Sequence, residues 1–78
     1  MNAGPSQDRF CVYQFFRDGT HERVRDWVLP EEAVLTAKHY CQCVGAQVGT
    51  TVRVIITDAE DRCVFEWQRG KGIIFPPP

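Results

Sequence analysis

The cysteines are the residues with the most obvious chemical potential in this sequence. An even number of them could form a disulfide framework, which requires an oxidising compartment. Residues 1–9 contain no apolar segment, so we expect no secretory signal and a cytoplasmic location. Reduced cysteine then behaves as a small apolar residue, and we predict buried free thiols. The four cysteines are Cys11, Cys41, Cys43 and Cys63.

His39 and Cys43 come closest to a reactive pair. Four residues apart on a helix they would share a face, and their side chains are ligands that zinc prefers. A closed structural site takes four ligands, however, and the sequence has no Cys-x-x-Cys motif. Nucleophilic catalysis would need a third group, such as Glu31 or Glu32, and a chain this short offers little room for a pocket. We therefore predict no metal, no cofactor and no enzymatic activity.

Arginines interleaved with aromatic residues indicate a second possible chemistry. Such surfaces hold single-stranded nucleic acid by base stacking and phosphate contact. Nine Lys and Arg against ten Asp and Glu leave a net charge of -1, without the basic excess typical of nucleic-acid or anionic-membrane binding. Cross-strand pairing with acidic residues would weaken the field further, so nucleic-acid binding is the alternative hypothesis. Its candidate anion contacts are Arg17, Arg53, Arg62, Arg69 and Lys71.

Length and composition predict one ordinary globular domain. The 78 residues allow a single core, and 44% hydrophobic with 24% charged residues argues against disorder. No apolar run approaches the roughly 20 residues of a membrane helix, so we expect no membrane partner. The domain is placed at residues 10–75, after a disordered leader at residues 1–9 and before a proline tail at residues 76–78.

Short segments rich in aromatic and β-branched residues predict an antiparallel sheet. Asp18-Gly19 separates the first two segments and is typical of a type I′ hairpin turn. A second turn at residues 59–61 joins the next two. The apolar residues 73–75 allow three interpretations: a last strand, a tail that fills the core or a docking segment. The predicted strands cover residues 10–16, 21–28, 51–58 and 62–67.

A helix is predicted to begin at Leu29-Pro30. Proline is tolerated in the first helical turn, and the two glutamates that follow complement the helix dipole. Leu29 is a poor N-cap, so other groups must satisfy the free amides. Gly45 or Gly49 would end the helix. Its apolar stripe is Ala33, Ala37, Tyr40, Cys41, Val44 and Val48.

These elements predict an α+β fold, a hairpin, a helix and a second hairpin (ββαββ). The four strands would form an antiparallel sheet with the helix on one face. Apolar side chains on the opposite face would be exposed unless a partner covers them. We expect on that face Tyr13, Phe15, Ile55 and Val64, or their neighbours if a bulge shifts the register. We therefore predict a protein-interaction domain whose partner is another protein or a second copy, as a homodimer. The candidate interaction surface is Tyr13, Phe15, Ile55, Val64, Ile73, Ile74 and Phe75.

Three segments resemble a class of small uncharacterised bacterial proteins. They are Tyr13-Gln14-Phe15-Phe16-Arg17-Asp18-Gly19, Leu29-Pro30-Glu31-Glu32-Ala33 and Ile56-Thr57-Asp58. The shared features, a Tyr-x-Phe-x-x-Asp-Gly opening and a Leu-Pro helix start, are structural, and the resemblance covers residues 12–75. Such proteins often carry a glycine in the second hairpin turn, which Ala59-Glu60-Asp61 lacks. The resemblance implies the same fold and supplies no catalytic residue.

Overall fold

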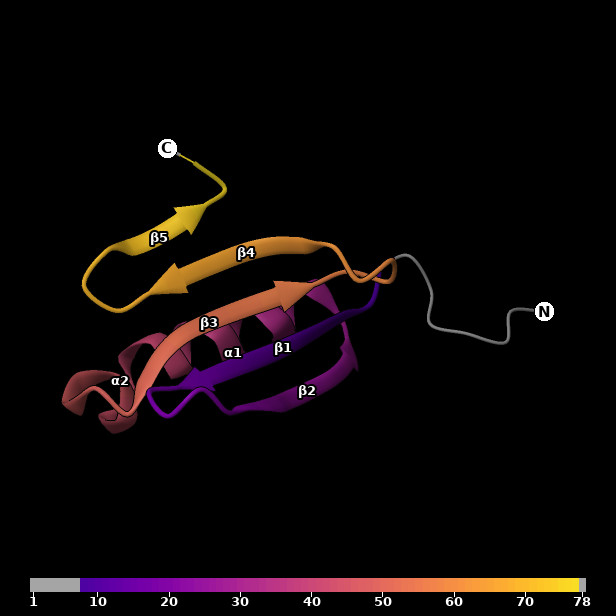
Figure 1. Ribbon diagram of the computed structural model, residues 1–78. Helices are drawn as coiled ribbons and strands as arrows, with labels where there is room; N and C mark the ends of the chain where they lie inside the picture. The colour runs from indigo at the N-terminus through magenta and orange to yellow at the C-terminus, as the bar shows by residue number, and fades with distance from the viewer. Residues whose placement is uncertain (1–7, 78) are drawn as a thin grey trace.

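The structure, a computed structural model, describes residues 8–77 of the chain (Figure 1). The predicted leader falls mostly outside the described residues, as does Pro78 of the predicted tail. Five strands and two helices follow one another in this part of the chain. They are β1 (Phe10–Phe16), β2 (His21–Val28), α1 (Pro30–Gln42), α2 (Val44–Val48), β3 (Thr51–Thr57), β4 (Cys63–Gln68) and β5 (Gly72–Phe75).

The strands form one antiparallel sheet in the order β2-β1-β3-β4-β5. The predicted α+β class and antiparallel sheet are confirmed, whereas the predicted number of four strands is wrong. The additional strand is β5, in which Ile73 lies opposite Trp67. Gly70 and Gly72 adopt positive φ values that glycine tolerates without strain, so the chain reverses tightly there and returns as a strand.

The first hairpin turn forms at the predicted Asp-Gly, but its geometry differs from the prediction. A type I′ turn needs positive φ at both central residues. Gly19 has a φ of 93°, whereas Asp18 is not among the residues with positive φ. The Asp18 carboxylate instead accepts hydrogen bonds from the backbone N–H and the hydroxyl of Thr20, at 2.9 and 2.7 Å. This local bonding stabilises the turn in another way.

The helix α1 begins where predicted and ends earlier. Leu29 is its N-cap and makes no side-chain cap hydrogen bond, and Pro30 lies in the first turn. Cys43 then adopts an extended backbone, with φ -70° and ψ 171°, which separates α1 from the short α2. The predicted stripe is therefore wrong at Val44 and Val48, which are 72% and 63% exposed.

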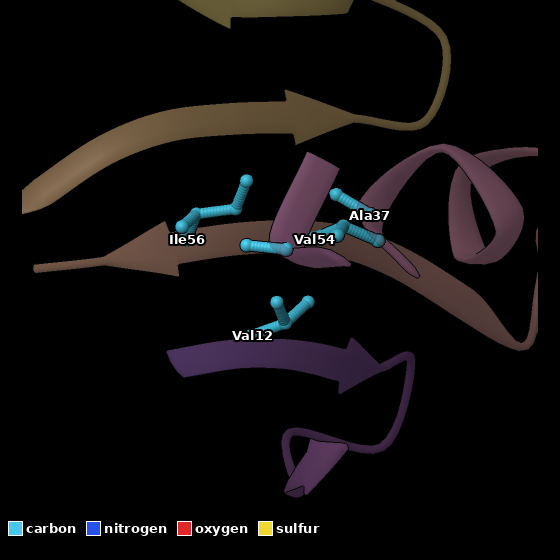
Figure 2. Packing of buried hydrophobic residues seen from close by; sticks show 5 residues of the cluster. Val12, Ala37, Val54 and Ile56 are labelled. Carbon is cyan, nitrogen blue, oxygen red and sulfur yellow. The ribbon is translucent and has the colours of Figure 1, made fainter. Parts of the chain in front are cut away.

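The core lies between α1 and the middle of the sheet. Ala33 and Ala37 of α1 are each 1% exposed and belong to one cluster with Val12, Val54 and Ile56 of β1 and β3 (Figure 2). Because alanine is small, the helix backbone can approach the strands closely. Larger, partly buried side chains surround this cluster: Phe10, Val24, Val28, Tyr40, Cys41, Phe65 and Trp67.

Within the described residues, α1 covers part of one sheet face. Within the sheet it contacts mainly β3 and β1 and to a smaller extent β2, and the sheet continues beyond it as β4 and β5 (Figure 1). Five strands at a spacing of about 4.8 Å span roughly 19 Å, whereas a helix is about 10 Å wide. The β4–β5 half of the sheet is therefore open on the side that carries α1.

Candidate functional site

The His39–Cys43 pair does not form the site that its spacing allows. Cys43 lies beyond the end of α1, so the two side chains do not share a helix face. The His39 ring packs edge-on against Tyr40 with centroids 5.0 Å apart, and the Cys43 thiol donates to the Tyr40 carbonyl oxygen at 3.4 Å. Glu32 pairs with Arg25 of β2 at 3.3 Å. Across the described part of the chain, no group of three or more His, Cys, Asp and Glu could hold a metal ion.

The cysteines are free thiols that differ in exposure. Cys11 is buried, and burial raises its pKa, opposed by a hydrogen bond with the Trp27 backbone. Burial also raises the pKa of Cys41 to about 11. Such thiols stay protonated at neutral pH and are poor nucleophiles. Cys63 is exposed, so the prediction of burial is wrong there, because a register shift places it opposite Thr57 on the other face.

The sheet face opposite α1 carries Tyr13, Phe15 and Ile55. In the register of β1 and β3, Tyr13 lies opposite Ile55, and Phe15 lies opposite Arg53. The Arg53 guanidinium stands over the Phe15 ring, 4.8 Å from its centroid. Arg23 stands over the Tyr13 ring at 5.3 Å. The chain's own cations therefore already cover these two rings, a favourable cation–π arrangement.

The same arginines are paired with carboxylates. Arg53 forms an ion pair with Glu66 of β4, and Arg23 forms one with Asp26 at 2.9 Å. Hydrogen bonds from Gln68 and Arg53 hold the pKa of Glu66 below its usual range. Pairing of this kind weakens the field that would attract a phosphate backbone.

The five residues predicted as anion contacts do not come together. Arg62 lies beside the turn between β3 and β4 and pairs with Asp58 at 3.1 Å and Glu60 at 3.0 Å. Arg53 lies on the sheet face opposite α1. The remaining three follow strand ends at the far end of the sheet from Arg62: Arg17, Arg69 and Lys71.

Arg69 has a structural partner in α2. Its side chain donates to the carbonyl oxygens of Ala46 and Gln47, at 3.0 and 3.2 Å. Carbonyl groups at a helix C-terminus have no partner within the helix, and cations are favoured there. Gly49, one of the two predicted stops, ends α2 with a φ of 92° and donates to Gly45.

Lowering the pH is expected to weaken the fold through Glu66. Its folded-state pKa is lowered because Gln68 and Arg53 bond to the ionised carboxylate. This contribution to stability is fully present above the unfolded pKa of about 4.3 and is lost as pH falls through the folded value. The difference in free energy of unfolding between the wild type and Glu66→Gln, from urea denaturation, should shrink between pH 7 and pH 3. A constant difference would contradict this role.

A groove runs along α1 on the side of β4 and β5. It consists of two adjoining hollows of about 520 and 400 Å³, and both are lined by Val34, Ile56 and Phe65. Lys38 and Gln42 contribute polar groups to the larger hollow, whereas the smaller one is lined by apolar residues. The other apolar lining residues are Phe10, Pro30, Ala33, Ala37, Cys41, Val64, Trp67 and Ile73.

Val64 lines this groove on the side that carries α1, and its neighbour Cys63 takes the opposite face, which is the alternative predicted for a bulge that shifts the register. The cause is a register shift between β3 and β4. Phe65 lies opposite Ile56, but the next pair along is Cys63 with Thr57, so β4 contains one extra residue there. Because side chains alternate between sheet faces, one extra residue exchanges the faces on either side of it.

The C-terminal apolar residues do not act as one segment. Ile73 lines the groove and is 58% exposed. Ile74 is the extra residue at a register shift between β4 and β5, and Phe75 lies opposite Glu66. Ile74 and Phe75 are 37% and 43% exposed. The segment therefore forms an edge strand and does not fill the core.

Sequence reasoning missed Val34, Phe65 and Trp67 as residues of an exposed groove. Phe65 and Trp67 do lie on one strand face, as their spacing indicates, and that face is the one α1 packs on. The signal that reveals their exposure is the fifth strand. Once residues 72–75 join the sheet, a single helix is too narrow to cover it.

Comparison with other proteins supplies no assignment for this site. In residues 8–77, no helix has the length and apolar character needed to span a membrane. Comparisons with protein-family models, curated proteins and solved structures found no match. The resemblance in the first hairpin and the helix start stays a prediction.

Proposed function

We propose that this chain is a non-enzymatic protein-interaction domain that binds an amphipathic helix of another polypeptide in the groove along α1. The observation that carries the proposal is the open apolar half of the sheet beside the helix. Val34 on one wall is 46% exposed, and Ile73 on the other is 58% exposed. Covering apolar surface gains about 25 cal/mol per Å², so a partner that fills the groove is favoured.

The dimensions of the groove support a helix as its ligand. The 13 residues of α1 span about 20 Å at 1.5 Å per residue, and the groove follows this helix. A second helix about 10 Å wide would cover roughly two strands, which matches the β4–β5 half that α1 leaves open. Helices bound in this way insert apolar side chains at helical spacing into the groove.

The chemistry of the lining disfavours a charged small molecule. Such ligands are bound by several polar groups that converge on them. Within the described residues, Lys38 is the one charged side chain of the larger hollow, and the smaller hollow has none. The apolar face of an amphipathic helix, which carries few charges, fits this lining better.

The alternative proposal, nucleic-acid binding, would use the opposite face. Tyr13, Phe15 and His21 gather there, with the His21 ring centroid 6.2 Å from Tyr13 and 5.2 Å from Phe15. Clustered rings can stack on bases. The ion pairs of Arg23 and Arg53 weigh against this alternative. Oligonucleotide binding that falls steeply with salt would support it instead.

Chemical-shift mapping can test the groove directly. The probe is a designed amphipathic helical peptide with a leucine face, titrated into the labelled protein at low concentration. Amide shift changes are expected to cluster at Val34, Phe65 and Ile73. Changes that cluster at Tyr13 and Ile55 would place binding on the opposite face and contradict the proposal.

The variant Ile73→Asp is expected to weaken binding of this peptide at least about tenfold. A carboxylate in the apolar groove loses hydration when the peptide binds, and a penalty of roughly 1.4 kcal/mol corresponds to that factor. Val48→Asp is the matched control, because Val48 is also exposed, at 63%, and does not line the groove. Equal affinities of the two variants for the peptide would contradict the proposal that the peptide binds in the groove.

A further inference from the structure

The wall of the groove that α1 forms carries opposite charges at its two ends. Lys38 lines the larger hollow, where Ile73 also lies. Glu31 follows Pro30, which lines the smaller hollow, and it precedes Lys38 by seven residues. Seven residues are close to two helical turns, so both residues lie on the same side of α1, about 10.5 Å apart along its axis. The rim of the groove is therefore negative beside the smaller hollow and positive beside the larger one.

Other residues of the chain leave these two charges unneutralised. Both side chains are exposed, and among residues 8–77 neither Glu31 nor Lys38 takes part in an ion pair. Glu66 of β4 could have opposed Lys38, but it is bonded to Arg53 on the sheet face away from α1. Lys71, exposed and next to the larger hollow in sequence, adds a positive charge at that end.

We infer that the helix bound in the groove offers a carboxylate to Lys38 and, seven residues later, a cation to Glu31. This inference rests on the proposed function and specifies the partner. Charged residues that flank an apolar seam between two helices set the choice of partner and its orientation. A partner helix over β4 and β5 would lie beside α1, with Glu31 and Lys38 along the rim between the two helices.

The order of these charges makes the partner helix antiparallel to α1. The helix α1 runs from the smaller hollow at Pro30 to the larger hollow at Gln42. An antiparallel partner begins beside Lys38, so its carboxylate lies near its N-terminus and its cation near its C-terminus. These are the positions at which each charge is favoured by the dipole of the partner helix itself. A parallel partner would need the reverse order, which its dipole disfavours.

Two segments of the chain itself fit these requirements less well. Residues 1–7, with the sequence MNAGPSQ, contain no charged side chain that could pair with Glu31 or Lys38. The helix α1 of a second copy has a carboxylate and a cation seven residues apart, but its apolar stripe is buried against its own sheet. It therefore lacks the free apolar face needed to fill the groove.

Two designed peptides with the same leucine face test the charge pattern. One has a glutamate near its N-terminus and a lysine seven residues later, both flanking the leucine face, and the other has these two residues exchanged. Fluorescence anisotropy measures the affinity of each peptide for the wild type and for the double variant Glu31→Lys/Lys38→Glu. The ratio of the two affinities should be at least about fivefold higher for the wild type than for the variant. High salt should reduce this difference.

The double variant is also its own control. Its net charge equals that of the wild type, and both positions are exposed. The helical tendency of each peptide and any loss of protein stability affect the two proteins or the two peptides equally, so they cancel in the comparison of ratios. The same ratio for both proteins would overturn the inference.

A nitroxide at the N-terminus of the first peptide tests the orientation. It should broaden the amide resonances of Gly72 and Ile73 more than those of Phe10 and Val64. Stronger broadening at Phe10 and Val64 would show a parallel helix and overturn the inference. Shifts of the groove amides that depend on protein concentration without peptide would show a second copy there and would overturn it as well.

The peptide titration described above separates this failure from that of the proposed function. Binding of both peptides in the groove with no difference in ratio between the two proteins would leave the proposed function in place and remove the inference. The absence of shift changes in the groove with either peptide would remove both.

Discussion

Replacing Ile56 with alanine is expected to lower the free energy of unfolding by about 2–4 kcal/mol. Ile56 is 4% exposed, belongs to the core cluster under α1 and also lines both hollows of the groove. Removing its side chain loses buried contacts and leaves a cavity. A folded domain is typically stable by only about 0.05–0.15 kcal/mol per residue, so this loss is a large fraction of the total for so short a chain.

The adjacent Ile55 is the matched control. It has the same side chain, but it is half-buried and faces the side of the sheet away from α1. We expect Ile55→Ala to cost less than about 1 kcal/mol, in the range of substitutions outside a core. Urea denaturation followed by circular dichroism measures both variants. Equal losses would contradict the assignment of the core to the α1 side.

The variant Ala37→Leu is expected to lower the free energy of unfolding by about 1–3 kcal/mol. Ala37 is 1% exposed and lies directly over the sheet in the core cluster (Figure 2). A larger side chain would push α1 away from β1 and β3. In a domain of this size the melting temperature should fall by roughly 5–15 °C, which calorimetry can measure.

Val34→Leu is the control for this substitution on the same helix. Val34 is 46% exposed at the wall of the groove, so an added methylene has room, and the expected change is within about 0.5 kcal/mol. A gain in stability for Ala37→Leu would reveal unfilled space under α1 and contradict the close approach of helix and sheet.

The local elements of the fold can be predicted because their signals are local. Asp18-Gly19 indicates the first hairpin, Pro30 the helix start and Gly49 the end of α2. Runs of aromatic and β-branched residues indicate the four longer strands. Each of these signals depends on the backbone preferences of one or a few neighbouring residues.

The faces of β4 cannot be predicted in the same way. They depend on the pairing of β4 with β3. A one-residue register shift between Ile56 and Thr57 exchanges the sheet faces on which the β4 side chains lie. Cys63 and Val64 consequently take the sides opposite to those that simple alternation predicts. No residue type near this shift marks its position.

The break between α1 and α2 is also a tertiary effect. Cys43 is neither proline nor glycine, yet its backbone is extended. Just after this break, α2 approaches β3 closely. A Cβ atom at Gly45 would stand only 2.9 Å from the Thr51 hydroxyl oxygen. Sequence periodicity alone continues the helix through this point and leaves Val44 and Val48 wrongly buried.

The position of the candidate interaction surface depends on the widths of the helix and the sheet as well as on residue types. The prediction concerned apolar side chains on the face opposite α1, whereas the exposed Ile73 and Val64 line the groove on the side that carries α1. Tyr13 and Phe15 lie opposite α1, where Arg23 and Arg53 cover them. Such cross-strand coverage depends on register, which the sequence does not reveal.

An isotope-filtered NOE experiment tests the central claim most directly. The labelled protein is mixed with the unlabelled amphipathic peptide, and only contacts between protein and peptide are recorded. Binding of a helix in the groove predicts contacts between the leucine methyl groups of the peptide and the Trp67 ring, which lines the groove. Intermolecular contacts confined to Tyr13, Phe15 and Ile55 would show that the groove is not where another chain binds.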